Sequence, residues 1–218
     1  MMPRCDLIVF DWDGTLMDSA AAIVHALQAA CRDLGLDEPE TARARHVIGL
    51  GLRDALQYVV PELPERDYAR LSERYRQHYL AHSDEIVLFE GVVPLLEELA
   101  ARGLLLAVAT GKSHAGLEDV LARTGLTARF HATRTADRCF SKPHPQMLEE
   151  LLEELGVSAD RALMIGDTTH DLLMAQNANV AAVGVSYGAH PEAALRALQP
   201  RACLDSVPAL AEWLLTRV

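Results

Sequence analysis

The stretch Leu7–Thr15, which reads LIVFDWDGT, decides both the fold class and the place of the chemistry. Its first part, Leu7–Phe10, is an unbroken apolar run, which is typical of a strand buried on both faces of a parallel sheet. The run ends abruptly at Asp11. Side chains two residues apart on an extended segment point the same way, so Asp11 and Asp13 would project together from the end of this strand. Because ligands bind at the carboxyl ends of strands in open α/β sheets, the stretch predicts a functional site there.

Further apolar runs of the same character alternate with helical patterns along the chain. They span residues 104–109, 162–165 and 180–185. Amphipathic helices are expected over residues 92–101 and 146–155. This alternation predicts an α/β fold, a Rossmann-like core with a parallel sheet and right-handed crossovers.

The region from about residue 19 to residue 83 breaks this rhythm, because it carries helical patterns and no convincing strand. Helices are expected over residues 20–34, 52–60 and 65–81. A compact domain rarely carries a structureless insertion of such length, so we interpret the region as an inserted helical cap domain. The expected boundaries are residues 18–85 for the cap and residues 1–17 with 86–218 for the discontinuous core.

Composition narrows the function. The chain of 218 residues has a formal net charge of −11, which argues against a nucleic-acid partner and against docking on anionic lipid. The four cysteines are far apart, so neither a zinc knuckle nor a disulfide framework is indicated. No apolar stretch is long enough for a membrane span or a signal peptide. We therefore expect a cytoplasmic protein without a membrane partner, as a monomer or a homodimer.

Three further motifs follow predicted strands or precede predicted helices. They are Thr110-Gly111-Lys112, Ser141-Lys142-Pro143 and the stretch from Gly166-Asp167 to Asp171. Each alone has an ordinary explanation, such as a helix N-cap, a solvated loop charge or a turn. Together with Asp11 they place a hydroxyl, an ammonium and several carboxylates at one edge of the sheet. Clustered carboxylates repel one another unless a cation or a proton is shared, and Mg²⁺ prefers carboxylate and carbonyl oxygens.

In this order and spacing, the four motifs resemble those of the haloacid dehalogenase-like hydrolase superfamily, in particular its phosphoglycolate-phosphatase-like branch. The family's first motif, DxDGT, stands as Asp11–Thr15, and its second, a Thr or Ser after a hydrophobic strand, as Thr110. The third, a Lys before Pro, stands as Lys142, and the fourth, GDxxxD, as residues 166–171. Four ordered motifs that extend over nearly the whole chain are far more specific than any one of them.

The resemblance implies a role for each residue. Asp11 would be the nucleophile that forms an aspartyl-phosphate, and Asp13 would protonate the leaving group and then activate water. Asp11, the main-chain carbonyl of Asp13, and Asp167 would bind Mg²⁺. Asp171 would support the site by orienting Lys142 or a water molecule bound to the ion. The phosphoryl oxygens would be held by Thr110, Lys142 and the backbone N–H groups of Trp12, Asp13 and Gly111.

The resemblance implies Mg²⁺-dependent hydrolysis of a small phosphorylated metabolite, a phosphomonoester like phosphoglycolate. A sugar phosphomutase of the β-phosphoglucomutase type would keep all four motifs and remains an alternative. A phospho-acceptor signalling module is a second alternative, although such modules lack a helical cap and the second acid of the DxD motif, which is Asp13 here. Asp13 and the acidic fourth motif argue against a metal-free dehalogenase. Phosphonatases of this superfamily use a cap lysine to form a Schiff base, and no lysine precedes Gly111 in this chain.

Other polar residues have weaker claims. Lys112 is expected to face solvent. The pair His78 and His82 has the spacing of two zinc ligands on a helix but no evident third ligand, so an exposed helix face is expected. In this branch the cap loops face the active site, which makes Arg45, His46 and Arg53 candidates for substrate contact.

Overall fold

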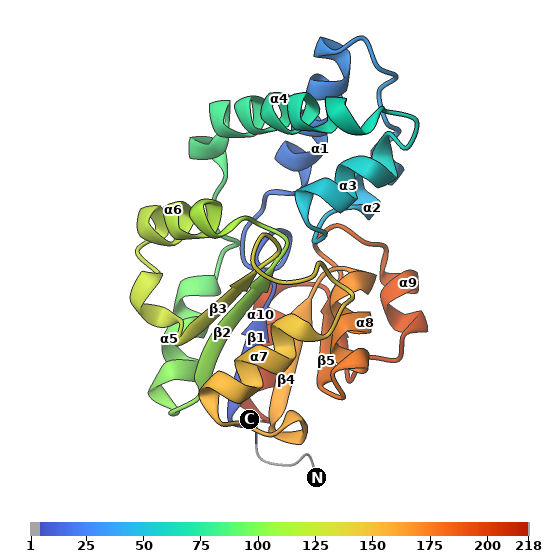
Figure 1. Cartoon of the computed structure of the whole chain (residues 1–218). Coiled ribbons are helices and arrows are strands. Elements are labelled where there is room, and N and C mark those ends of the chain that lie inside the picture. Colours follow the sequence, from blue (N-terminus) through green and yellow to red (C-terminus); the bar gives the residue numbers. More distant parts are fainter. Residues whose placement is uncertain (1–4, 218) are drawn as a thin grey trace.

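A six-stranded, fully parallel sheet forms the centre of the computed structural model, which describes residues 5–217 (Figure 1). Its strand order is β3-β2-β1-β4-β5-β6. The strands are β1 (Leu7–Phe10), β2 (Leu105–Thr110), β3 (Ala132–Thr135), β4 (Ala162–Gly166), β5 (Ala181–Val185) and β6 (Cys203–Leu204). The predicted α/β fold class is therefore confirmed, and the first strand lies inside the sheet between two parallel neighbours.

Helices cover both faces of this sheet, as the apolar runs require. Along β1, Ile8 and Phe10 point into one apolar layer, while Leu7 and Val9 point into the other. The first layer includes α5 (Val92–Ala101), α6 (His114–Thr124) and α10 (Val207–Leu215). The second layer includes α7 (Gln146–Leu155), α8 (Thr169–Asn177) and α9 (Glu192–Ala197).

The helical insertion packs around an apolar cluster of its own, and we call helices α1–α4 the cap. They are α1 (Ala20–Asp33), α2 (Thr41–His46), α3 (Leu52–Val59) and α4 (Tyr68–Ala81), with α1 and α4 lying side by side (Figure 1). A short 3₁₀ turn, Glu65–Asp67, precedes α4, so that helix begins later than its predicted start. The boundaries 18–85 stay a prediction, and residues 1–4 and 218 of the predicted core lie outside the described residues.

The cap lies over the carboxyl ends of the strands (Figure 1). Hydrogen bonds join it to loops at that edge: the Gly51 amide donates to Ser141 Oγ at 2.8 Å, and Arg45 Nε donates to the Ala189 carbonyl at 3.0 Å. Lys112, just beyond β2, donates to the hydroxyl of Tyr79 on α4 at 2.9 Å. The loops that carry the predicted site residues are thereby enclosed between the two parts of the chain.

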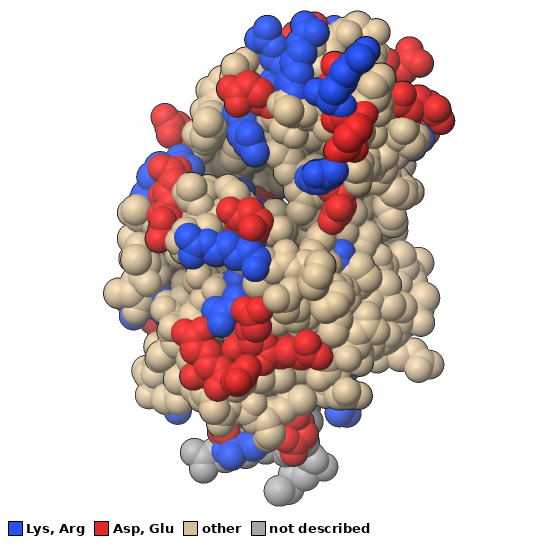
Figure 2. Space-filling view, in the orientation of Figure 1, with Lys and Arg blue, Asp and Glu red and all other residues tan. Residues whose placement is uncertain are grey.

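The surface is divided by charge (Figure 2). Acidic side chains gather over α7, whereas basic side chains are prominent on the cap in this view. The α7 carboxylates are Glu149, Glu150, Glu153 and Glu154. Among the described residues, we find no helix with the length and apolar character that a membrane crossing requires.

Two leucines of α4 test how the cap is held together. Leu71 is fully buried in the cap cluster, whereas Leu80 on the same helix is 63% exposed. We expect Leu71→Ala to lower the free energy of unfolding by about 3 kcal/mol, because it leaves a cavity, and Leu80→Ala to change it by less than about 0.5 kcal/mol. Urea titrations followed by circular dichroism measure both; equal effects would contradict the packing described.

Candidate active site

The side chain of Lys142 is the centre of the site. Its Nζ donates to Asp11 Oδ1 at 2.7 Å and to Asp171 Oδ1 at 2.6 Å, and all three side chains are fully buried. The strand ends bring them together: Asp11 directly follows β1, and Asp171 lies in the first turn of α8, which follows β4. The other oxygen of Asp171 accepts from the amide and hydroxyl of Thr168, which forms a capping box at the start of α8.

Asp167 lies beside this ion-pair group at the end of β4. Its Oδ1 accepts from the Thr15 hydroxyl at 2.8 Å, and its Oδ2 accepts from the Ala189 amide at 2.7 Å. Gly14 makes this close approach possible: its φ is +86°, and a Cβ there would clash with the Asp167 carboxylate. Thr15, which belongs to the first motif but received no role from sequence reasoning, and Ala189, which sequence reasoning did not single out, therefore orient a predicted metal ligand.

Two features dominate the electrostatics of the site: its carboxyl groups are buried, and too little positive charge lies beside them to balance their negative charge. Carboxylate oxygens of Asp11, Asp167 and Asp171 lie within 4.8 Å of one another, so the group could hold a metal ion. Burial, together with Asp171, raises the pKa of Asp167 to about 7. Burial also raises the pKa of Asp11, although Lys142 opposes this. The pKa of Lys142 is raised because Asp11 and Asp171 outweigh its own desolvation, so its ammonium stays charged.

One oxygen of this group lacks any partner among the described residues. Asp11 Oδ2 is buried and accepts no hydrogen bond, which is costly for a carboxylate unless a ligand or a cation completes its shell. Three carboxyl groups face one ammonium, so ionising all three would leave an excess of negative charge. Both observations fit a divalent cation with oxygen ligands. The carboxylates that gather here belong to Asp11, Asp167 and Asp171, whereas the Asp13 side chain has other partners.

Asp13 points its carboxylate toward two donors from different parts of the chain. Its Oδ1 accepts from Ser19 Oγ at 2.7 Å and from Lys112 Nζ at 3.0 Å. The expectation that Lys112 faces solvent was wrong, because its side chain is only 12% exposed and also donates to Tyr79. Ser19 stands at the N-cap position of α1, but its hydroxyl bonds Asp13 instead of capping the helix. A serine at a predicted helix start, shortly after Asp13, was the available sequence signal.

The predicted phosphate-binding residues line the same edge. Thr110 ends β2 and is fully buried, and its Oγ1 accepts from the Lys112 amide at 3.2 Å. Gly111 lies against the cap, where the backbone oxygens of Gly49 and Leu50 leave no room for a Cβ. The Trp12 indole is buried in the core layer, donates to Met17 Sδ at 3.3 Å and contacts Phe130 edge-on. Phosphate binding by these residues stays a prediction.

The cap residues proposed for substrate contact have other partners. Arg45 donates to the carbonyl oxygens of Gly188 and Ala189, and thus fastens the cap to the loop after β5. Arg53 is exposed and forms an ion pair with Glu65.

The pair expected to form an exposed helix face also has protein partners. His78 Nε2 lies 2.9 Å from Asp33 Oδ2, and His82 Nδ1 lies 3.2 Å from the His78 carbonyl.

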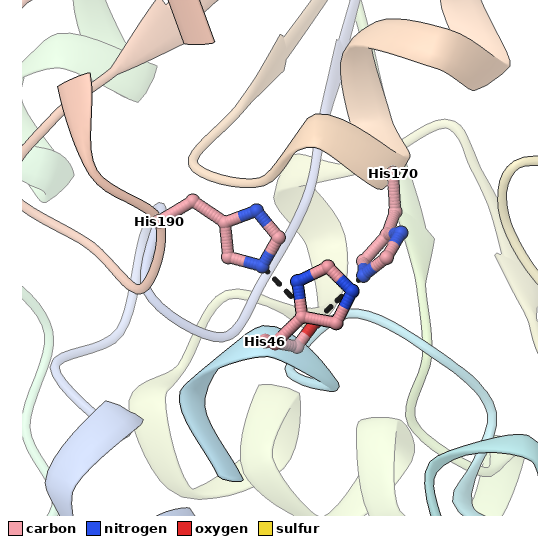
Figure 3. Close-up of side chains that lie close together, drawn as sticks. All are labelled: His46, His170 and His190. Carbon is pink, nitrogen blue, oxygen red and sulfur yellow. Dashed lines mark hydrogen bonds between the residues drawn. The ribbon is translucent and has the colours of Figure 1, made fainter. Parts of the chain in front are cut away.

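Three histidines from the cap and the core lie together (Figure 3). His46 ends α2, His170 is on α8, and His190 follows β5; their nitrogens lie within 4.8 Å of one another, close enough to hold a metal ion.

The Thr169 amide donates to His190 Nδ1 at 3.0 Å, which places the ring proton on Nε2. That Nε2 lies 3.0 Å from the His46 carbonyl oxygen, and His170 Nε2 lies 2.7 Å from the same oxygen. Burial lowers the pKa of His190 to about 4, so its ring stays neutral. Two imidazoles therefore cap the last carbonyl of α2, and the cluster fastens the cap to the core.

Together, the fold and the site define a hydrolase whose buried carboxylates lie at the end of a parallel sheet under a helical cap. The family model described as haloacid dehalogenase-like hydrolase matches residues 8–185, and the chain belongs to this family.

Known proteins extend the likeness over nearly the full length. The protein named "Probable phosphatase IndB" from Dickeya dadantii is 37% identical, with 92% of this chain and 89% of that protein covered. A phosphoglycolate phosphatase from Agrobacterium fabrum is 33% identical, with 95% and 91% covered. The crystal structure of a hydrolase from Pseudomonas syringae aligns with a TM-score of 0.90 at 25% identity, over 99% of this chain and 100% of that one. The chain is accordingly an enzyme, a phosphoric monoester hydrolase.

Gly111 provides a test of whether the closed cap is needed for activity. A Cβ at this position would push against the Gly49 and Leu50 backbone, so Gly111→Ala should hold the cap away from the site. We expect kcat/KM for p-nitrophenyl phosphate to fall on the order of 10²-fold, as misplaced catalytic groups cause. Gly184→Ala is the matched control, because its Cβ would meet its neighbours at an ordinary 3.5 Å. Wild-type activity in Gly111→Ala would refute this role of the cap contact.

Proposed function

We propose that this enzyme hydrolyses a small phosphorylated metabolite in a Mg²⁺-dependent reaction through an aspartyl-phosphate on Asp11. The observation that carries the proposal is the buried Oδ2 of Asp11, which has no hydrogen-bond partner among the described residues and lies beside the ammonium of Lys142. A carboxylate so placed has one oxygen oriented by the protein and the other available to a ligand. A metabolite like phosphoglycolate is the substrate class that the Agrobacterium fabrum relative supports.

The reaction would proceed in two displacements. Asp11 attacks phosphorus, the ester P–O bond breaks with its electron pair moving to the leaving oxygen, and Asp13 gives that oxygen a proton. Water then attacks phosphorus and gives a proton to Asp13, which releases inorganic phosphate and restores Asp11. Lys142 stays charged and lies beside the phosphoryl group, where it stabilises the developing negative charge.

The carboxylates at the site fit a resident Mg²⁺. Asp11 and Asp167 would hold the ion, with the Asp13 main-chain carbonyl as a further oxygen ligand, while Asp171 is committed to Lys142 and Thr168. When bound, the ion supplies positive charge that offsets the buried carboxylates and favours the approach of a phosphate dianion. The cap excludes water from the enclosed site.

The nucleophile is tested by Asp11→Asn with a panel of esters: 2-phosphoglycolate, a hexose phosphate, a nucleoside monophosphate and p-nitrophenyl phosphate. Wild type with Mg²⁺ should release phosphate from at least one metabolite, and Asp11→Asn should reduce release on the order of 10³-fold or more, because the amide cannot form the intermediate. Isomerisation of the hexose phosphate without net phosphate release would favour a phosphomutase instead. Wild-type rates in Asp11→Asn would refute the mechanism.

The raised pKa of Asp167 makes metal binding depend on pH. The cation needs the ionised carboxylate, so its apparent affinity is full above the pKa of about 7 and falls as protons compete below it. Isothermal titration of Mg²⁺ should show affinity falling about tenfold per pH unit below pH 7. The control Asp167→Asn should bind more weakly and depend on pH less steeply, with Asp11, whose pKa burial also raises, as the remaining titrating ligand. A wild-type affinity for Mg²⁺ that stays constant between about pH 5.5 and about pH 8, within the precision of the method, would contradict the assignment of Asp167 as a ligand.

A further inference from the structure

Lys112 is a buried cation that the proposed chemistry does not use. It is one of only two lysines in the chain, and the other is Lys142. Its Nζ lies 3.0 Å from Asp13 Oδ1 and 2.9 Å from the Tyr79 hydroxyl, and it stands 4.7 Å from the centre of the Tyr79 ring. Taking an ammonium out of water is costly unless it is paired, and here the partners come from two different parts of the molecule.

These partners join the cap to the core. Tyr79 is on cap helix α4, whereas Lys112 follows β2 and Asp13 follows β1. The Lys112–Tyr79 hydrogen bond therefore exists only when α4 is docked over the strand ends. Without Tyr79, one of the two protein partners of the ammonium would be lost.

The same contact fixes one oxygen of Asp13. Lys112 and Ser19 both donate to Oδ1, and Ser19 stands at the start of cap helix α1. With Oδ1 taken by two donors, Oδ2 is the oxygen left to exchange a proton with the leaving group. Because α1 and α4 pack against each other, both donors depend on the same docked cap.

We propose that Lys112 is a positioning residue that couples docking of the cap, through Tyr79, to the orientation of the Asp13 carboxylate. The inference rests on the proposed function, in which Asp13 Oδ2 gives a proton to the leaving oxygen as the ester P–O bond breaks. Lys112 then acts through Asp13, and its loss matters most where the leaving oxygen needs that proton.

Esters that differ in leaving group separate this role from others. An alkyl phosphate leaves as a strongly basic alkoxide and needs a proton, whereas p-nitrophenyl phosphate leaves as a stable anion and does not. We would measure kcat and KM for p-nitrophenyl phosphate and for the alkyl ester that the wild type hydrolyses fastest in the panel above. The variants are Lys112→Met, Tyr79→Phe and the control Tyr75→Phe, whose ring stacks on Tyr79 at 6.0 Å.

We expect Lys112→Met to lower kcat for the alkyl ester about 10²-fold more than kcat for p-nitrophenyl phosphate. Tyr79→Phe should shift the ratio of the two kcat values in the same direction by a smaller factor. Tyr75→Phe should shift the ratio less than Tyr79→Phe, since among the described residues no hydrogen bond joins the Tyr75 hydroxyl to Lys112 or Asp13. Retained activity toward p-nitrophenyl phosphate shows in the same assay that each variant is folded.

Three outcomes would overturn the inference. An equal loss for both esters would mean a structural role, and a higher KM with an unchanged ratio of kcat values would mean that Lys112 binds substrate directly. If Lys112→Met fails to fold, a ratio of the two kcat values that Tyr79→Phe leaves unchanged would overturn the inference. A wild type inactive toward every ester would instead refute the proposed function, which keeps the two failures distinguishable.

Discussion

The buried ammonium of Lys142 between Asp11 and Asp171 is the interaction on which the site depends. Each carboxylate follows a different strand of the sheet, and the lysine comes from the loop before α7, so the contact joins three separate segments. Removing one member of such a buried group leaves an uncompensated charge. The group is still short of positive charge, because Asp167 adds a third carboxylate. The carboxylates lie close enough together that the group could hold a metal ion.

The cap completes a site that the sheet only begins. The parallel strands supply the carboxylates and Lys142, whereas the cap helices supply Ser19 and Tyr79 near Asp13. Further contacts, from Arg45 to the loop after β5 and from two imidazoles to the His46 carbonyl, hold the cap over the strand ends. Asp11, the proposed nucleophile, thus belongs to the core alone, while the orientation of Asp13, the proposed proton donor, depends on both parts. Under the proposed function, this division would let cap docking affect proton transfer more than phosphoryl binding.

The sequence predicted what local patterns encode. Apolar runs located β1, β2, β4 and β5, and the motifs beside them located the carboxylates and Lys142. The edge strand β3 was missed because it carries Thr133 and Arg134 in place of an apolar run. The environment of Lys112 could not be predicted, since its partners lie 33 and 99 positions away along the chain, one of them in the insertion. Such contacts follow from how the cap docks, which no local pattern encodes.

Trapping the covalent intermediate tests the central claim most directly. The wild-type enzyme is mixed with an ester carrying a radioactive phosphoryl group, quenched in acid within a single turnover and digested for peptide mapping. The account predicts transient label on the peptide that contains Asp11, lost on treatment with hydroxylamine, as an acyl phosphate requires. Label on any other residue, or phosphate release at full rate with no labelled protein at any time, would contradict it.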